Sequence, residues 1–254
     1  MNLHLQIVLR FLYSKFGNSF SSNASILAII GLSIGLFSLI LTLSIIKGFE
    51  NTLDEKLSSI DGKVRVQNIL GKSISRLEKL DSLLSGINFP LNVAPYIRGT
   101  AMIRHGDNTY GIIIEGLDRI PDQAYFVLES YTIDKDDIII GKALADEMDI
   151  VIGDKIIITS LSNPNNHAID QKFNLMEVIG FIDSGMQEYD KTIAYTSIDR
   201  ARDIFEMDNE VSGYTINSSE QVENLTKVLN GYIKYPYYYE TWKERHRIIF
   251  DWIK

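Results

Sequence analysis

The longest apolar run of the chain covers residues 26–46, where 21 consecutive residues carry no charge. An α-helix rises about 1.5 Å per residue, so this run reaches roughly 31 Å, the thickness of the hydrocarbon core of a bilayer. Backbone groups find no water there, so the segment must be helical. We therefore predict an uncleaved membrane-spanning helix. The alternatives are a buried helix of a soluble protein and a signal peptide, but the run is long for a signal peptide and no small-x-small cleavage site follows it.

Amphipathic patterns flank this run on both sides. Residues 1–22 begin with polar positions spaced by four among apolar ones, which is typical of a helix lying in the membrane interface. After the run, Phe49, Leu53 and Leu57 keep helical spacing among charged residues, so the helix should continue as a stalk. Span and stalk together are assigned to residues 23–60.

The remainder of the chain alternates between strand and helix patterns. Strand-helix-strand occurs near residues 63–97 and again near 213–239, with predicted helices over 73–85 and 219–230. We expect an α+β fold in which residues 61–97 and 211–240 form one βαβ lobe and residues 98–210 form an inserted, mostly β lobe. Within the insertion, the pattern predicts a hairpin over 92–115, strands over 137–140, 155–160, 173–182 and 192–195, and helices over 142–148 and 197–205, the last capped by Ser197.

The last segment, residues 241–254, is basic, aromatic and amphipathic. We expect it to be a helix that leads back to the membrane, with Trp242 and Trp252 in the interfacial belt.

Charge is distributed unevenly along the chain. Residues 1–49 contain three of the 25 basic residues and none of the 33 acidic residues, so the part beyond the span is strongly acidic. A basic flank before a span predicts a cytoplasmic N-terminus and an external main domain. The acidic outer part argues against nucleic acid as a partner.

The sequence contains no convincing active site. Residues Gly31 to Gly35 match the G-x-S-x-G elbow of serine hydrolases, but that motif needs a strand, a sharp turn and an exposed serine rather than a membrane span. Gly71-Lys72-Ser73 resembles the end of a phosphate-binding loop, yet Val66 occupies the position of its first glycine. There is no cysteine, and no two of the four histidines form a local metal pair. We expect neither catalytic residues, nor a metal, nor a cofactor.

Gly31 and Gly35 also form a GxxxG motif, which leaves a flat groove for a second helix. We therefore expect this face of the span to pack on a partner helix.

Several motifs in order resemble a known family. Residues 29–50 end in Lys47-Gly48-Phe49-Glu50, and they are followed by the segments 111–118, 138–156 and 176–185. This set resembles the N-terminal part of the permease subunits of lipoprotein-releasing ABC transporters (LolC/LolE-like), within the FtsX/MacB-like permease family. The resemblance covers nearly the whole chain.

The resemblance implies a two-lobed, MacB-like periplasmic domain anchored in the bacterial inner membrane. It implies a permease that extracts lipoproteins and passes them to a periplasmic chaperone, with ATP hydrolysed by a separate subunit, so that the chain itself is not an enzyme. The implied partners are that ATPase, a second permease subunit or the remaining permease spans, and the lipoprotein. Ile46, Phe49 and Leu53 would contact the lipoprotein.

In the family a protruding loop binds the chaperone, and its equivalent here is the segment 161–171. The candidate residues are Asn163, Pro164, Asn165 and His167, and the segment departs from the family in having one proline and no arginine.

A second departure concerns the number of spans. Similar permeases have four, whereas this sequence stops where the second should begin, so we expect a fragment, a split gene product or a version cut at that point. The alternative function is a single-span, membrane-anchored periplasmic binding or scaffold protein (FtsX-like) without transport activity. An apolar groove beside the stalk would favour lipoprotein handling, and a flat acidic surface would favour scaffolding.

Overall fold

A computed structural model describes residues 20–75, 90–119, 126–128, 133–161, 172–219 and 221–247. The chain divides into an N-terminal unit, Met1–Asp54, and a C-terminal domain that begins at Glu55. Residues 1–19, which hold most of the predicted interfacial helix, lie outside the described part, as do residues 248–254 with Trp252.

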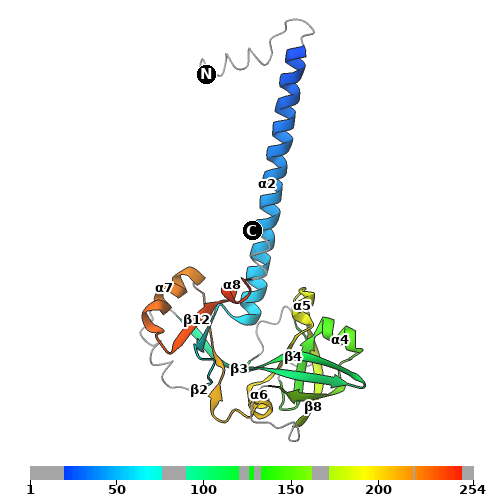
Figure 1. Cartoon of the computed structure of the whole chain (residues 1–254), viewed down its shortest axis with the longest axis vertical. Helices are drawn as coiled ribbons and strands as arrows, with labels where there is room; N and C mark the ends of the chain where they lie inside the picture. Colours follow the sequence, from blue (N-terminus) through cyan, green and yellow to red (C-terminus); the bar gives the residue numbers. More distant parts are fainter. Residues whose placement is uncertain are drawn as a thin grey trace. The chain divides into compact units, whose positions relative to one another are not determined.

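A single helix, α2 (Phe20–Asp61), contains the predicted span and continues beyond it (Figure 1). Its segment Ile26–Thr52 is long and apolar enough to cross a membrane, with a mean hydropathy of 2.6 and no buried side chains. The hydroxyls of Thr42 and Ser44 donate to the carbonyls of Ser38 and Ile40, each over 2.8 Å, which satisfies polar groups within the helix itself. The helix is thus continuous through the predicted stalk.

The C-terminal domain is built on a ten-stranded sheet in the order β12-β1-β11-β3-β4-β9-β6-β8-β5, with β7 pairing both β3 and β8. Because β7 joins β8 back to β3, the strands β3, β4, β9, β6, β8 and β7 close into a barrel. In Figure 1 the long strand β3 runs from the part that holds β12 and α7 (Val222–Tyr232) into the part that holds α4 (Lys142–Met148) and β8. The strands are β1 (Val64–Asn68), β3 (Leu91–His105), β4 (Asn108–Leu117), β5 (Phe126–Leu128), β6 (Asp137–Gly141), β7 (Lys155–Ser160), β8 (Phe173–Ile182), β9 (Ile193–Ser197), β11 (Gly213–Ser218) and β12 (Tyr237–Thr241).

Two main hydrophobic cores lie on either side of α6 (Ile198–Phe205). One fills the barrel with side chains such as Ile103, Ile140 and Met176, together with α4 (Lys142–Met148). The other packs Val64 and Ile216 against α7 (Val222–Tyr232) and other apolar residues. Ile204 of α6 belongs to the barrel core and Ala201 to the second core, while Phe205 packs against both. The helix α6 therefore joins the two cores.

Many predicted elements are present with small shifts in their ends. The hairpin, the four inserted strands, α4 and α6 occur where the pattern placed them, and the Ser197 hydroxyl accepts from the Arg200 N–H at 3.3 Å as an N-cap. The helix α7 begins at Val222, later than the predicted residue 219, and it ends at Tyr232, beyond the predicted residue 230. Two short helices complete the domain, α5 (Gln187–Asp190) and α8 (Trp242–Arg245).

Two predictions are wrong. Residues 73–75, expected to start a helix, instead include the strand β2 (Ile74–Ser75), which pairs with β10 (Glu210–Val211). The rest of that predicted helix, residues 76–89, lies outside the described residues. Trp242 does not reach an interface: it is fully buried at the start of α8, and its backbone N–H donates to the Lys63 carbonyl.

Candidate functional site

The first residues after α2 are fixed to the sheet. Gly62 has φ = 73°, and a Cβ added to it would lie 2.0 Å from a methyl of Thr215, so only glycine fits both the conformation and the space. The backbone N–H of Lys63 donates to Asn217 Oδ1 at 2.8 Å, and its ammonium donates to the Ser218 carbonyl at 2.7 Å. The chain therefore enters β1 in one defined position.

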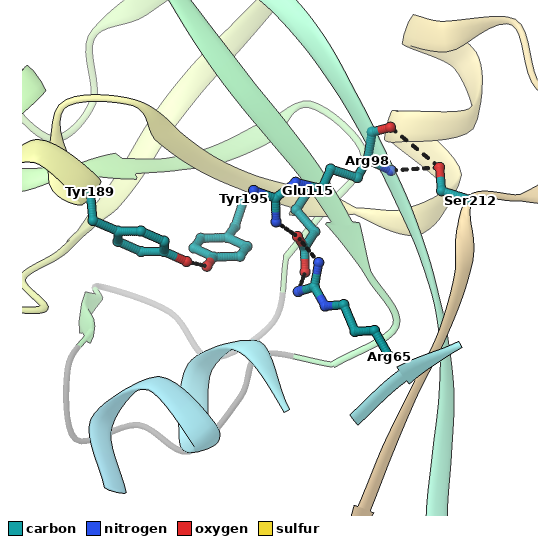
Figure 2. A network of polar contacts seen from close by, with 6 residues as sticks. All are labelled: Arg65, Arg98, Glu115, Tyr189, Tyr195 and Ser212. Carbon is teal, nitrogen blue, oxygen red and sulfur yellow. Dashed lines mark hydrogen bonds and ion pairs between the residues drawn. The ribbon is translucent and has the colours of Figure 1, made fainter. Parts of the chain in front are cut away.

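A buried ionic cluster begins on β1, four residues beyond the end of α2 (Figure 2). Arg65 donates from both terminal nitrogens to Glu115 of β4, at 2.9 and 2.5 Å, and both side chains are 1% exposed. Arg98 of β3, directly opposite Glu115 in the sheet, donates to the same carboxylate at 2.8 Å. One buried carboxylate thus holds two guanidinium groups in short, charge-assisted contacts.

Tyr96 forms one side of this cluster. The Arg65 guanidinium lies over its ring, 4.4 Å from the centroid, in a cation–π contact. Burial raises the pKa of Tyr96 to about 12, against a smaller opposite effect of the Arg65 charge. The phenol therefore stays neutral and adds packing rather than charge to the cluster.

Neutral hydrogen bonds extend the network at Ser212, and a separate tyrosine pair lies nearby (Figure 2). The Arg98 backbone N–H donates to the Ser212 hydroxyl at 2.9 Å, and that hydroxyl donates back to the Arg98 carbonyl at 3.3 Å. The hydroxyls of Tyr189 and Tyr195 share a 2.7 Å hydrogen bond. We name Arg65, Tyr96, Arg98, Glu115 and Ser212 the junction cluster.

The junction cluster is suited to joining strands rather than to catalysis. In the sheet order, β11 and β3 lie between β1 and β4, so the Arg65–Glu115 pair links two strands that share no backbone hydrogen bonds. Its three charged groups are mutually paired, and no group of metal-ligating side chains occurs in the described ranges. The arrangement makes β1 and the barrel a single connected body.

The predicted packing and contact residues lie on α2. A Cβ added to Gly31 or Gly35 would meet no atom within 4 Å, so this stretch is open to a neighbouring helix. Phe49 is 53% exposed and Ile46 is half-buried, on the same helix face by their spacing. Leu53 belongs to α2 as well. Their roles stay predictions.

The chaperone-loop candidates Asn163, Pro164, Asn165 and His167 lie outside the described residues, between β7 and β8. Their role also stays a prediction.

Sequence reasoning did not identify the junction cluster. Arg65 lies between Val64 and Val66, and this alternation indicates a strand with one side facing solvent. Arg65 is in fact buried, but a buried arginine at this position gives the same sequence pattern as an exposed one. The one available signal was Glu115, a lone carboxylate that follows three isoleucines in a strand.

Comparison with known proteins identifies the family. The profile of the MacB-like periplasmic core domain matches residues 25–229. The lipoprotein-releasing system transmembrane protein LolC of Neisseria meningitidis serogroup B is 25% identical over 86% of this chain and 55% of its own length. The protein of the same name from Xylella fastidiosa (strain Temecula1) is 23% identical over 99% of this chain and 63% of its own length. The chain therefore spans between half and two thirds of these relatives.

Among solved structures, the periplasmic region of MacB from Actinobacillus actinomycetemcomitans is similar, with a TM-score of 0.46 and 13% identity over 78% of this chain and 98% of that one. The profile match, which covers most of the chain, decides the assignment. The chain belongs to the family of ABC-transporter permeases that carry a MacB-like periplasmic core domain.

Proposed function

We propose that the chain is the N-terminal part of a permease subunit that extracts lipoproteins from the bacterial inner membrane and passes them to a periplasmic carrier. A separate ATPase subunit would hydrolyse ATP, and the N-terminus would lie in the cytoplasm with the main domain in the periplasm. The observation that carries the proposal is the similarity to two proteins named as parts of lipoprotein-releasing systems, over 86% and 99% of this chain. The apolar segment of α2 supports a membrane location.

In this proposal the chain has a mechanical role. The helix α2 passes without interruption from its apolar segment to Asp61, and the next residues are held by β11. Arg65 then ties β1 to β4 through Glu115. We propose that a displacement at the end of α2 would reach the barrel through these contacts.

Lipoprotein contact is assigned to the face of α2 that carries Ile46, Phe49 and Leu53. These positions differ by three and four residues, so they fall on one side of the helix, and Asn51 falls on the opposite side. Apolar side chains at the end of the span would contact the acyl chains of a lipoprotein as it leaves the bilayer.

The test is photo-crosslinking in cells that carry the full chain, with a photoreactive amino acid at Phe49 or, as the matched control, at Asn51. We expect acylated lipoproteins to crosslink at position 49 and several-fold less at position 51. Phe49→Asp should reduce lipoprotein capture, and Asn51→Asp should not. Equal crosslinking at both positions, or crosslinking that does not depend on the acyl chains, would contradict the proposal and favour an anchored binding protein.

A further inference from the structure

Two tight turns lie side by side at the end of β1 that is remote from Gly62. In the turn 68–71, the Gly71 N–H donates to the Asn68 carbonyl at 2.9 Å. In the turn 234–237, the Tyr237 N–H donates to the Lys234 carbonyl at 3.0 Å. The Ile69 N–H joins the two turns through the Pro236 carbonyl at 2.9 Å. These bonds give the two turns a fixed arrangement.

The centres of these turns are apolar and exposed. Ile69 is 57% exposed, Leu70 63% and Tyr235 79%. Turn centres usually carry Gly, Pro, Asn, Asp or Ser, because those residues suit the backbone and the solvent. Large apolar side chains gathered at a rigid, exposed position are typical of an interaction surface. We call Ile69, Leu70 and Tyr235 the turn patch.

A hollow of about 390 Å³ opens beside the turn patch. One wall comes from the turn 68–71 and the residues around it, and the other includes Phe205 and Met207 at the end of α6. This volume is within the range of small-ligand pockets and is large enough for one or two side chains. The lining residues are Gln67, Asn68, Gly71, Lys72, Ser73, Tyr96, Arg98, Gly99, Phe205, Met207 and Ser212.

Charge favours one kind of occupant. The lining contains Lys72 and Arg98, of which Arg98 is already paired with Glu115, and, among the residues that the structure describes, no carboxylate. Lys234 is exposed next to Tyr235 in the second turn. One carboxylate, that of Glu210, lies at the edge of the hollow, where it accepts from the Ser73 hydroxyl and keeps its charge, so the two lysines outnumber it. The whole chain has a net charge of −8, so a basic margin around an apolar patch stands out from its surroundings. An acidic partner complements this margin.

We propose that the turn patch and the adjacent hollow bind an acidic, apolar segment of a partner protein. One apolar side chain of the partner would enter the hollow between Phe205 and the turn, others would cover Leu70 and Tyr235, and its carboxylates would face Lys72 and Lys234. This inference goes beyond the proposed transport function, because it depends neither on the cargo nor on an ATPase.

The test uses the full chain in nanodiscs of zwitterionic lipid and two fluorescent peptides. One peptide alternates leucine with glutamate, and the matched peptide alternates leucine with lysine. Fluorescence anisotropy, corrected with empty nanodiscs, measures binding. We expect saturable binding of the leucine–glutamate peptide alone, weakening as salt is added. Absence of saturable binding, or equal binding of both peptides, would overturn the proposal.

Variants locate the binding. Leu70→Ser should weaken the affinity for the leucine–glutamate peptide about tenfold, as expected for a central apolar contact. Lys72→Gln should weaken that affinity by a smaller factor that depends on salt. Val151→Ser and Lys155→Gln are matched controls at exposed positions outside the patch, and they should leave binding unchanged. Equal losses in the controls would show that the peptide does not bind at the turn patch.

Discussion

Buried charge is the most informative feature at the residue scale. Glu115 is 1% exposed and accepts from Arg65 and Arg98, so its charge is compensated twice within hydrogen-bonding distance. Two cations remain without their shared counter-ion if that carboxylate is removed. Breaking such a buried pair on one side is far more costly than replacing the whole pair.

Glu115→Gln should therefore lower the free energy of unfolding of the domain by about 3–5 kcal/mol. Urea denaturation followed by circular dichroism measures this change. Glu147→Gln is the matched control, because Glu147 pairs with Lys191 at the surface and should contribute little. Equal destabilisation of the two variants would contradict the central role given to the junction cluster.

Gly141 is fixed by close packing rather than by its backbone angles. A Cβ at this position would lie 1.7 Å from the Asp190 carbonyl oxygen, where β6 meets α5. Gly141→Ala should destabilise the domain by about 1–3 kcal/mol through overpacking. The thermal unfolding midpoint measures this, and Gly111→Ala is the control, because nothing lies within 4 Å of its added Cβ. An unchanged midpoint for Gly141→Ala would show that α5 can move away.

Tyr96 makes stability depend on high pH. Its pKa rises from 10.0 to about 12 on folding because of burial, so the folded state holds its proton more tightly than the unfolded state. Its contribution is complete below pH 10 and is lost as the pH rises towards 12. Tyr96→Phe should flatten the stability profile in that interval, as measured by denaturation at a series of pH values. If the profile of Tyr96→Phe is as steep as that of the wild type, the loss of stability at high pH comes from other groups and contradicts this prediction.

At the level of single helices and strands, caps and apolar periodicity predicted the elements that local interactions stabilise. The cap Ser197 and the periodicity after it marked α6, and the alternation of apolar residues marked β7 and β8 at their observed ends. The helix predicted to begin at residues 73–75 is wrong, because Ile74 pairs in a strand with Val211, which is far along the chain. Such a tertiary pairing overrides a local helical pattern. The prediction that Trp242 lies in the membrane interface is wrong, because composition alone cannot separate a membrane-facing aromatic residue from a buried one.

The continuity of α2 can be tested at Gly48, which is exposed and has no neighbour within 4 Å of an added Cβ. Proline there removes a helical hydrogen bond and clashes with the preceding turn, at a cost of about 3 kcal/mol. We expect Gly48→Pro to abolish lipoprotein release, and Gly48→Ala, which favours the helix, to preserve it. Inner-membrane vesicles supplied with ATP provide the measurement. Equal release by the two variants would show that a rigid stalk is unnecessary.

At the scale of the domain, the strand β3 and the junction cluster connect what the sequence presented as separate patterns. The second strand-helix-strand unit and the strands of the insertion could be recognised from periodicity. The closure of the barrel could not be predicted from the sequence, because the pairing of β7 with both β3 and β8 depends on strand curvature rather than on any residue pattern. The buried cluster was equally hidden, since an alternating arginine fits an exposed strand face as well as a buried one.

We propose that this chain takes part in moving lipoproteins out of the inner membrane. The most direct measurement is ATP-dependent release of a labelled lipoprotein from spheroplasts to a soluble carrier, with the chain depleted and then restored. We predict that depletion leaves the lipoprotein in the inner membrane and that restoring the wild-type chain, but not Phe49→Asp, recovers release. Release at the same rate with and without the chain would contradict this proposed function.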